Sequence, residues 1–357
     1  MRIAATALHH YALPLRHEWR SAGGAFTVRR GWLLRLSTDS GLAGYGECAP
    51  LPSHGTEDNA AALRALQRWQ ASLPGREAGE ALETLAEADS FATPAARCAV
   101  ETALLDLIAR ATERSLTHCV RQCRCSGAIA TNAMLGDLEQ VTPADIATAC
   151  AAGFRVLKLK LGDGDPEALL AAIRLRCGAM AQGVRLRLDA NRAWSADTAR
   201  HILGGLAHLP IESVEEPLDA ADPDTLAELQ TMVPFPLALD ESLREFPPDI
   251  LFDRPPVRRL VLKLAPLGGF LPALTLAQRG AAAGLSSVVT TGVDSACGTC
   301  AALHLAATLG NDLAHGLDTS RWLAADTGAP PLVSFGMMQV PTATGSGFMP
   351  RSDLGFS

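Results

Sequence analysis

The chain has 357 residues, of which 48% are hydrophobic, so it can bury a large core and is expected to form more than one domain. Its formal net charge is -7 and its charges are scattered, which argues against nucleic-acid binding and favours a small-molecule partner. The sequence has no uninterrupted apolar run of about 18 residues, so no membrane span is expected.

The N-terminal segment and the cysteines favour a cytoplasmic protein. His9 and His10 interrupt the first apolar stretch well before it reaches the length of a signal-peptide core. Nine cysteines cannot all pair within one chain, and reduced thiols are the simpler account. Cys297 and Cys300 have the spacing of a redox motif, but small packing residues in the first turn of a helix would have the same spacing.

The first 125 residues predict an α+β unit. Residues 25–52 have the pattern of an antiparallel hairpin, in which Asp39-Ser40-Gly41 supplies the turn. Two long helical patterns follow, at residues 57–73 and 93–115. The second opens with a Thr-Pro pair, which suits the N-cap and the first helical position.

A short segment at the start of the hairpin, residues 18–26, contains Arg20, Ser21 and the pair Gly23-Gly24. This composition is typical of a mobile lid, whose arginine could bind a second carboxylate group of a substrate. An ordinary polar loop would have the same composition, so both interpretations stay open.

From residue 129 onward, short β-rich runs alternate with helical segments. Eight such runs in about 190 residues match the repeat length of a (β/α)8 barrel, with one crossover shortened near residues 247–255. The predicted strands lie near residues 129–135, 155–162, 184–191, 211–218, 236–242, 259–266, 286–293 and 314–319.

The predicted fold class is therefore α/β, with three parts in chain order. Residues 1–125 form an α+β capping domain, and residues 126–321 form the barrel that carries the chemistry. A tail rich in proline and glycine, residues 322–357, is expected to return and pack on the capping domain.

Three carboxylates end successive predicted strands. Asp189, Glu215 and Asp240 each close a short apolar run, and they lie 26 and 25 residues apart (189 to 215 to 240). Successive β/α units deliver such residues to one rim of a barrel, where they can bind one divalent cation. A lone Asp at a strand end is usually a helix N-cap, but three at one period are hard to explain as caps. Oxygen ligands favour magnesium first and manganese second.

Three lysines flank these carboxylates. Lys160 lies 29 residues before Asp189, and Lys263 lies 23 residues after Asp240. Lys158 and Lys160 alternate with leucines, so both amines are expected in the barrel interior. Burial, mutual repulsion and a nearby cation would lower a lysine pKa from about 10.4 toward neutrality, giving a base for removing a proton next to a carboxylate. For Lys158, pairing with a barrel carboxylate for packing is an alternative.

With these motifs the sequence resembles the enolase superfamily, in its muconate-lactonizing-enzyme-like subgroup. The resemblance covers essentially the whole chain and rests on the Lys-x-Lys motif, the Asp, Glu and Asp ligands and the lysine of the sixth strand. It implies a (β/α)7β-type modified TIM barrel with an α+β capping domain. It also implies the chemistry known for this superfamily, in which a lysine or histidine base works with magnesium on an ene-diolate. No His ends the sixth or seventh predicted strand, which argues against the branch with a histidine base.

Within that subgroup, the runs LDANRAW, DESLRE, TTGVDSACG and HGLDT resemble o-succinylbenzoate synthases, the dehydratases of menaquinone biosynthesis. The resemblance implies that Lys160 removes the α-proton and, in a syn elimination, returns it to the departing hydroxyl. Lys263, on the opposite face, would stabilise the anion, and Lys158 would help to lower the pKa of Lys160 and contact the carboxylate.

Residues for specificity and support are expected at other strand ends. Thr290, Thr291, Gly292 and Gly316 offer hydroxyls and close backbone approach for the distal part of a substrate, together with Arg20 and Ser21 of the segment 18–26. Asn191 is expected to support the metal site, and Asp294 to orient groups near the seventh strand.

Other functions stay open. An N-acylamino acid racemase or dipeptide epimerase would use both Lys160 and Lys263 to exchange protons, and a muconate-type cycloisomerase would act on a diacid. Epimerases usually carry Asp-x-Asp on the last strand, where this chain has Gly316-Leu317-Asp318. From a different class, a non-catalytic metal-binding or thiol-redox protein would not need Lys160. The expected partner is a small-molecule carboxylate, and barrels of this family often form homo-oligomers.

Overall fold

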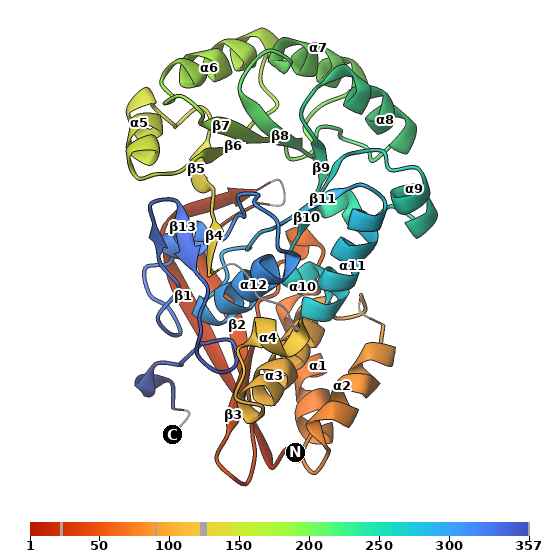
Figure 1. The fold of residues 1–357 in the computed structure, drawn as a ribbon, viewed down its shortest axis with the longest axis vertical. Coiled ribbons are helices and arrows are strands. Elements are labelled where there is room, and N and C mark those ends of the chain that lie inside the picture. The colour runs from red at the N-terminus through yellow and green to blue at the C-terminus, as the bar shows by residue number, and fades with distance from the viewer. Residues whose placement is uncertain (22–23, 90, 122–126, 356–357) are drawn as a thin grey trace.

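The computed structural model describes residues 1–21, 24–89, 91–121 and 127–355, and the side chains of Arg20 and Ser21 lie outside the described part. A parallel sheet with helices on its outer side forms one end of the molecule, and an antiparallel sheet with a group of helices forms the other (Figure 1). Among the described residues, no helix is both long and apolar enough to cross a membrane.

The capping domain is built on one antiparallel sheet. Its order is β1-β2-β3, with β1 at Ala5–Ser21, β2 at Gly24–Ser37 and β3 at Ala43–Cys48. The β2–β3 hairpin has the predicted turn, where Gly41 adopts a left-handed φ of 84°. The long strand β1 was not predicted, and its pairing with β2 makes the described part of residues 18–26 the end of a second hairpin.

The described part of this domain also contains four α-helices: α1 (Asn59–Ser72), α2 (Ala78–Glu87), α3 (Pro94–Ala111) and α4 (Leu116–Val120). Helix α3 begins at the predicted proline, but its cap is not local. The carboxylate of Glu57 accepts hydrogen bonds from the N–H groups of Ala95 and Ala96, at 3.0 and 2.8 Å. The start of α3 is therefore joined to the residues that precede α1.

Seven parallel strands form the barrel sheet, in the order β11-β10-β9-β8-β7-β6-β5. The strands are β5 (Ala133–Asp137), β6 (Val156–Lys160), β7 (Arg185–Asp189), β8 (Ile211–Glu215), β9 (Leu237–Leu239), β10 (Arg259–Leu262) and β11 (Ser286–Val289). The helices between and after them are α5 (Pro143–Ala151), α6 (Pro166–Gly178), α7 (Ala196–Leu206), α8 (Pro223–Met232), α9 (Pro248–Asp253), α10 (Leu264–Leu267), α11 (Phe270–Ala282) and α12 (Ala296–Leu309). The six-residue α9 occupies the crossover that was predicted to be short.

The two ends of the barrel sheet differ from the prediction. The first predicted strand is split, because β4 (Ala128–Ala130) pairs with β13 (Met337–Gln339) in the tail, next to β12 (Val333–Ser334). The predicted eighth strand, residues 314–319, makes only single bridges, from His315 to Thr131 and from Gly316 to Thr290. It then turns into the 3-10 helix η3 (Asp318–Trp322), which ends the extended backbone. The modified barrel thus closes through two bridges.

The tail contacts the capping domain as well as the barrel. Asp106 of α3 accepts a hydrogen bond of 2.6 Å from the N–H of Ser346, and Arg110 donates one of 2.8 Å to the carbonyl of Phe348. The rings of Phe348 and Tyr45 pack edge to face, with centroids 5.6 Å apart. An apolar cluster that contains both rings also includes Val293 and Ala296, so the cap and the barrel share a core.

His304 of α12 predicts a pH dependence of stability. It is fully buried between Thr117 of α4 and the carbonyl of Ser346, and burial lowers its pKa to about 4. Between pH 6.5 and pH 4 the unfolded chain binds this proton and the folded chain does not, so stability falls as the pH falls. The expected loss between pH 7 and pH 5 is about 2 kcal/mol.

The measurement is urea unfolding of wild type and His304→Gln at these two pH values. The variant should lose less stability on acidification than wild type by about that amount. His201→Gln, at a half-exposed histidine on α7, is the control and should leave the wild-type difference unchanged. Equal losses in wild type and His304→Gln would contradict the assignment.

Candidate active site

Neighbouring strands align the predicted residues at one end of the barrel. Lys160 of β6 lies opposite Asp189 of β7, and Asp189 lies opposite Glu215 of β8. In a parallel sheet, residues in one such row direct their side chains to the same side. Asp240 follows β9, and Lys263 follows β10 at the same end. The structure therefore brings the five residues together from five successive strands.

A cavity at this end of the barrel collects most of the predicted residues. Both lysines of the Lys-x-Lys motif line it, and Lys263 lines it from another side. Glu215 does not line the cavity and is fully buried. The complete lining consists of Trp19, His54, Asn132, Met134, Lys158, Lys160, Asp189, Asn191, Asp240, Glu241, Lys263, Thr290, Thr291, Gly316, Asp318 and Thr319.

Lys158 links two of the carboxylates. Its ammonium donates a short hydrogen bond to Glu215 and lies 3.0 Å from the Asp189 Oδ2 atom. Burial opposes the charge of this amine, but Asp189 and Glu215 raise its pKa well above the ordinary lysine value. The position of Lys158 agrees with the alternative that pairs it with barrel carboxylates, which favour its charged form.

Lys263 is held beside the third carboxylate. Its ammonium donates to Asp240 Oδ2 at 2.5 Å, and Glu241 Oε1 lies 3.7 Å away. Burial opposes its charge, but Asp240 and Glu241 raise its pKa well above the ordinary value, which suits the expected role of a cation. Glu216 supports this corner, because one of its oxygens accepts hydrogen bonds from the N–H groups of Asp240 and Ser242, at 2.6 and 3.0 Å.

Lys160 differs from the other two lysines. Burial lowers the pKa of its amine, the charges of Lys158 and Lys263 add to this effect, and Asp189 opposes it. The ammonium lies over the indole ring of Trp19, 4.5 Å from the ring centroid. A lysine with a lowered pKa is a proton acceptor nearer to neutral pH, which is the property that a general base requires.

The three carboxylates offer the oxygen ligands that a hard cation prefers, although their present contacts are with lysines. Among the described residues, no three His, Cys, Asp or Glu side chains are arranged as a metal site, and the ammonium groups of Lys158 and Lys263 lie against Asp189, Glu215 and Asp240. The Oε1 atom of Glu215 is buried, lies 4.0 Å from the Arg187 Nε atom and has no hydrogen-bond partner within the described part of the chain. A buried carboxylate oxygen without a donor is a suitable ligand for a divalent cation, so the donor set fits Mg²⁺.

The residues predicted for specificity divide into two groups. Thr290, Thr291 and Gly316 line the cavity, and a Cβ at Gly316 would lie 2.8 Å from the Thr290 methyl carbon, which explains the need for glycine there. Gly292 and Asp294 do not line the cavity. Asp294 instead lies 4.0 Å from the Arg29 guanidinium, away from the position expected for it.

Asn191 supports the site, whereas the side chains of Arg20 and Ser21 are not described. Asn191 lines the cavity, and its backbone N–H donates to Asp189 Oδ1 at 3.1 Å, so its support of the carboxylate comes from the main chain. Arg20 and Ser21 lie outside the residues whose side chains are described. The role of the segment 18–26 as a substrate-binding lid therefore stays a prediction.

The prediction missed the residues that the capping domain contributes. Trp19 of β1 covers Lys160, and His54 of the 3-10 helix η1 (Pro52–His54) contacts Lys263. Trp19 lies in the segment 18–26, next to Arg20, so the lid-like composition of that segment was the signal that could have pointed to it. No pattern marked His54, because only docking of the cap brings it to a lysine 209 residues away (54 to 263).

The two cysteines with redox spacing are packing residues. Cys297 and Cys300 are free thiols that are 3% and 2% exposed, and they belong to the apolar cluster shared by cap and barrel. Burial raises the pKa of Cys300 to about 12 and that of Cys297 well above the ordinary value. Because the thiolate is the reactive form, these residues do not have the properties of a redox pair.

Comparisons with known proteins agree with this arrangement over the whole chain. A family model described as "Enolase C-terminal domain-like" matches residues 142–354, and one described as "MenC, N-terminal domain" matches residues 2–98. The o-succinylbenzoate synthase of Thermobifida fusca is 31% identical over 328 residues, which are 90% of this chain and 83% of that protein.

Relatives with other activities are similar to a comparable degree. The N-succinyl-L-Arg/Lys racemase of Bacillus cereus is 26% identical over 314 residues, which are 84% of this chain and 83% of that protein. A dipeptide epimerase from Enterococcus faecalis, solved in complex with Mg and the dipeptide L-Leu-L-Tyr, superposes with a TM-score of 0.87 at 26% identity, covering 97% of this chain and 99% of that one.

Proposed function

Because the chain belongs to the enolase superfamily, in its muconate-lactonizing-enzyme-like subgroup, we propose that it is a magnesium-dependent dehydratase of the o-succinylbenzoate synthase type. Its substrate would be a small carboxylate with a proton on the α-carbon and a hydroxyl on the β-carbon. The observation that carries the proposal is the pair Lys160 and Lys263, which line one cavity together with Asp189 and Asp240.

Asp189, Glu215 and Asp240 would hold the divalent cation, whose charge would neutralise the substrate carboxylate and so lower the cost of forming an ene-diolate. Lys160 would take the α-proton, because it is the lysine of the three with a lowered pKa. The electron pair of the C–H bond passes into the carboxylate. In the second step this pair forms a new double bond between the α- and β-carbons as the bond to the β-hydroxyl breaks, and the ammonium of Lys160 gives its proton to that hydroxyl, which leaves as water.

The other two lysines would act as cations in this reaction. The carboxylates around Lys158 and Lys263 raise both pKa values, so both amines keep their protons at neutral pH. Lys263 would stabilise the negative charge from the face opposite Lys160, and Lys158 would hold the carboxylate end. In a dehydration only one amine transfers a proton, so this division of charge suits that reaction.

The end of the barrel near residue 318 favours a substrate without an amine. Asp318 lines the cavity, but Arg321 of η3 lies 3.2 Å from its Oδ2 atom, and Gly316 stands at the other position of the Asp-x-Asp motif. A single carboxylate that is already paired is a poor site for an ammonium group. The hydroxyl of Thr290, buried and without a hydrogen-bond partner among the described side chains, would instead suit a carbonyl or carboxylate oxygen.

A racemase of N-succinyl amino acids is the second candidate. Two amines that face one cavity are the arrangement that proton exchange at one carbon requires, and similarity to the racemase of Bacillus cereus supports this candidate. In that reaction Lys263 would have to lose a proton that Asp240 now helps to retain. The dehydratase is therefore the first choice.

Purified protein with Mg²⁺ should be assayed against the cyclohexadiene precursor of o-succinylbenzoate and, in parallel, against N-succinyl amino acids, dipeptides and muconate. The proposal expects loss of water from the cyclohexadiene precursor as the fastest reaction. Faster racemisation of N-succinyl amino acids, or faster turnover of dipeptides or muconate, would overturn the dehydratase in favour of the corresponding activity.

A further inference from the structure

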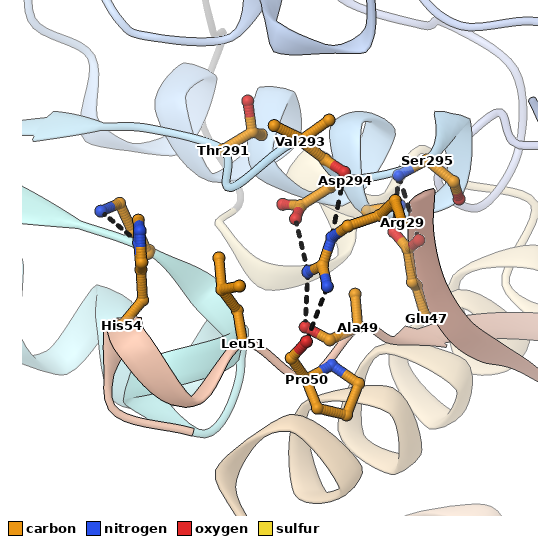
Figure 2. Close-up of polar contacts among 12 residues, drawn as sticks. Arg29, Glu47, Ala49, Pro50, Leu51, His54, Thr291, Val293, Asp294 and Ser295 are labelled. Carbon is orange, nitrogen blue, oxygen red and sulfur yellow. Dashed lines mark hydrogen bonds and ion pairs between the residues drawn. The ribbon is translucent and has the colours of Figure 1, made fainter. Parts of the chain in front are cut away.

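The segment Ala49–Gly55 of the capping domain reaches the barrel end and carries His54 to the site. Its start is fixed by Arg29, which is 3% exposed and donates hydrogen bonds of 2.6 Å to the carbonyls of both Ala49 and Pro50 (Figure 2). Its end is fixed by Arg244 of the barrel, which donates to the carbonyl of Gly55. Gly55 has a φ of 87°, which favours glycine at this turn.

The same arginine holds the barrel loop that follows β11. The Arg29 Nε atom donates to the carbonyl of Val293 at 3.3 Å, and the guanidinium lies 4.0 Å from Asp294 (Figure 2). Val293 has a φ of 60°, an uncommon and strained conformation for a β-branched residue. Nearby, Glu47 of β3 accepts hydrogen bonds from the N–H groups of Ser295 and Gly298, at 3.0 and 2.8 Å. The cap is thus bound to the barrel beside the site.

The hydrogen bond between His54 and Lys263 has a defined direction. The Nδ1 atom of His54 lies 3.0 Å from the Lys263 Nζ atom, and an ammonium group can only donate. Nδ1 is therefore the acceptor, and the ring proton lies on Nε2. The imidazole is neutral, because burial and the charge of Lys263 hold its pKa well below the ordinary value. The side chain is 9% exposed, so the contact is shielded from water.

We propose that His54 is a positioning residue, which orients the Lys263 ammonium toward the substrate by accepting one of its hydrogen bonds. Asp240 accepts a second proton, and Glu241 Oε1, at 3.7 Å, lies beyond hydrogen-bond distance, so two acceptors fix two of the three N–H bonds and direct the third. Lys160 has a different neighbour from the cap, the ring of Trp19. The cap would therefore set the two faces of the substrate independently. This inference rests on the proposed function.

The test measures dehydration by variants of His54. Enzyme with Mg²⁺ is assayed with the cyclohexadiene precursor of o-succinylbenzoate. His54→Phe should lower kcat by about 10- to 100-fold and change KM by less than about 2-fold, because the Lys263 ammonium would no longer be directed at the developing negative charge. His54→Asn, which keeps an acceptor near the Nδ1 position, should recover most of the rate. In a Lys263→Met background, His54→Phe should cause no further loss, because the group that it orients is absent.

His201→Phe on α7 is the matched control and should leave kcat unchanged. An unchanged kcat in His54→Phe, or an equal loss in the Lys263→Met background, would overturn the positioning role. The ¹⁵N shifts of the His54 ring provide a readout without substrate. They should report a neutral ring protonated on Nε2, and the Nδ1 signal should move in Lys263→Met. If the Nδ1 signal does not move, the inference fails. A wild type that turns over another substrate of the parallel assay would overturn the proposed function, and the kcat comparison is then made with that substrate.

Discussion

Replacing Lys160 by alanine is expected to lower kcat by about 10³-fold, within the range found for removal of a general acid or base. Lys160 is the lysine whose pKa is lowered by burial and by the charges of Lys158 and Lys263, and it lies in register with Asp189. Steady-state kinetics at saturating Mg²⁺, with the substrate that wild type turns over fastest in the parallel assay, provide the measurement.

A second variant separates lost chemistry from lost structure. The cavity left by Lys160→Ala can admit a small primary amine, so added ethylamine should restore part of the rate. Lys160→Met fills the same space under the Trp19 ring and should be inactive without any rescue. Both variants should retain the wild-type dependence of thermal stability on Mg²⁺. Activity of Lys160→Met near the wild-type level would exclude this lysine as the base.

Glu215→Gln is expected to weaken Mg²⁺ binding by about 10²-fold or more, at the upper end of the range for loss of a supporting ligand partner. Glu215 is fully buried, and its Oε1 atom has no hydrogen-bond partner in the described part of the chain. The substitution keeps the volume and removes the charge that would bind the cation. Isothermal titration with Mg²⁺ measures the affinity.

Thermal melting gives an independent check of the same variant. A ligand that binds only the folded protein adds about 2.7 kcal/mol of stability at 100 times its Kd, so Mg²⁺ should raise the Tm of wild type and hardly that of Glu215→Gln. Glu212→Gln on the same strand is the control. Glu212 pairs with Arg187 and Arg259 rather than with the site lysines, so its variant should be less stable and still gain stability from Mg²⁺. An unchanged Mg²⁺ response in Glu215→Gln would exclude it as a ligand.

The sequence was sufficient for the residues that local strand geometry places. The spacing of Lys160, Asp189 and Glu215 predicted one rim of a barrel, and the structure has them in one row of β6, β7 and β8. The alternation of Lys158 and Lys160 with leucines likewise predicted two inward amines, and both line the cavity. A period of two along a strand and one strand for each β/α unit are local rules, which a single sequence can reveal.

Residues whose position depends on distant segments could not be predicted in this way. His54 reaches Lys263 only because Arg29 and Arg244 fix both ends of its segment across the cap–barrel boundary. Asp294 was expected to orient groups at the end of the seventh strand, but its carboxylate lies 4.0 Å from the Arg29 guanidinium and does not line the cavity. Such contacts depend on how the cap and the barrel dock, and no repeating pattern in the sequence predicts them.

The direction of the pKa shift could be predicted from the sequence for Lys160 but not for Lys263. Mutual repulsion between neighbouring amines was readable from the Lys-x-Lys motif and applies to Lys160. For Lys263 the adjacent carboxylates Asp240 and Glu241 decide the direction, and they raise the value instead. Which carboxylate lies nearest to each amine follows from side-chain packing, and the order of residues along the chain does not determine it.

The proposed chemistry requires that Asp189, Glu215 and Asp240 share one divalent cation, with Lys160 and Lys263 on either side of the bound acid. Crystals grown with Mn²⁺ as a probe would test this arrangement through an anomalous difference map. We expect a single strong peak bonded to oxygens of all three carboxylates, with the ammonium of Lys158 displaced from Glu215. A map without a peak among these carboxylates, or with its main peak elsewhere, would exclude the shared cation.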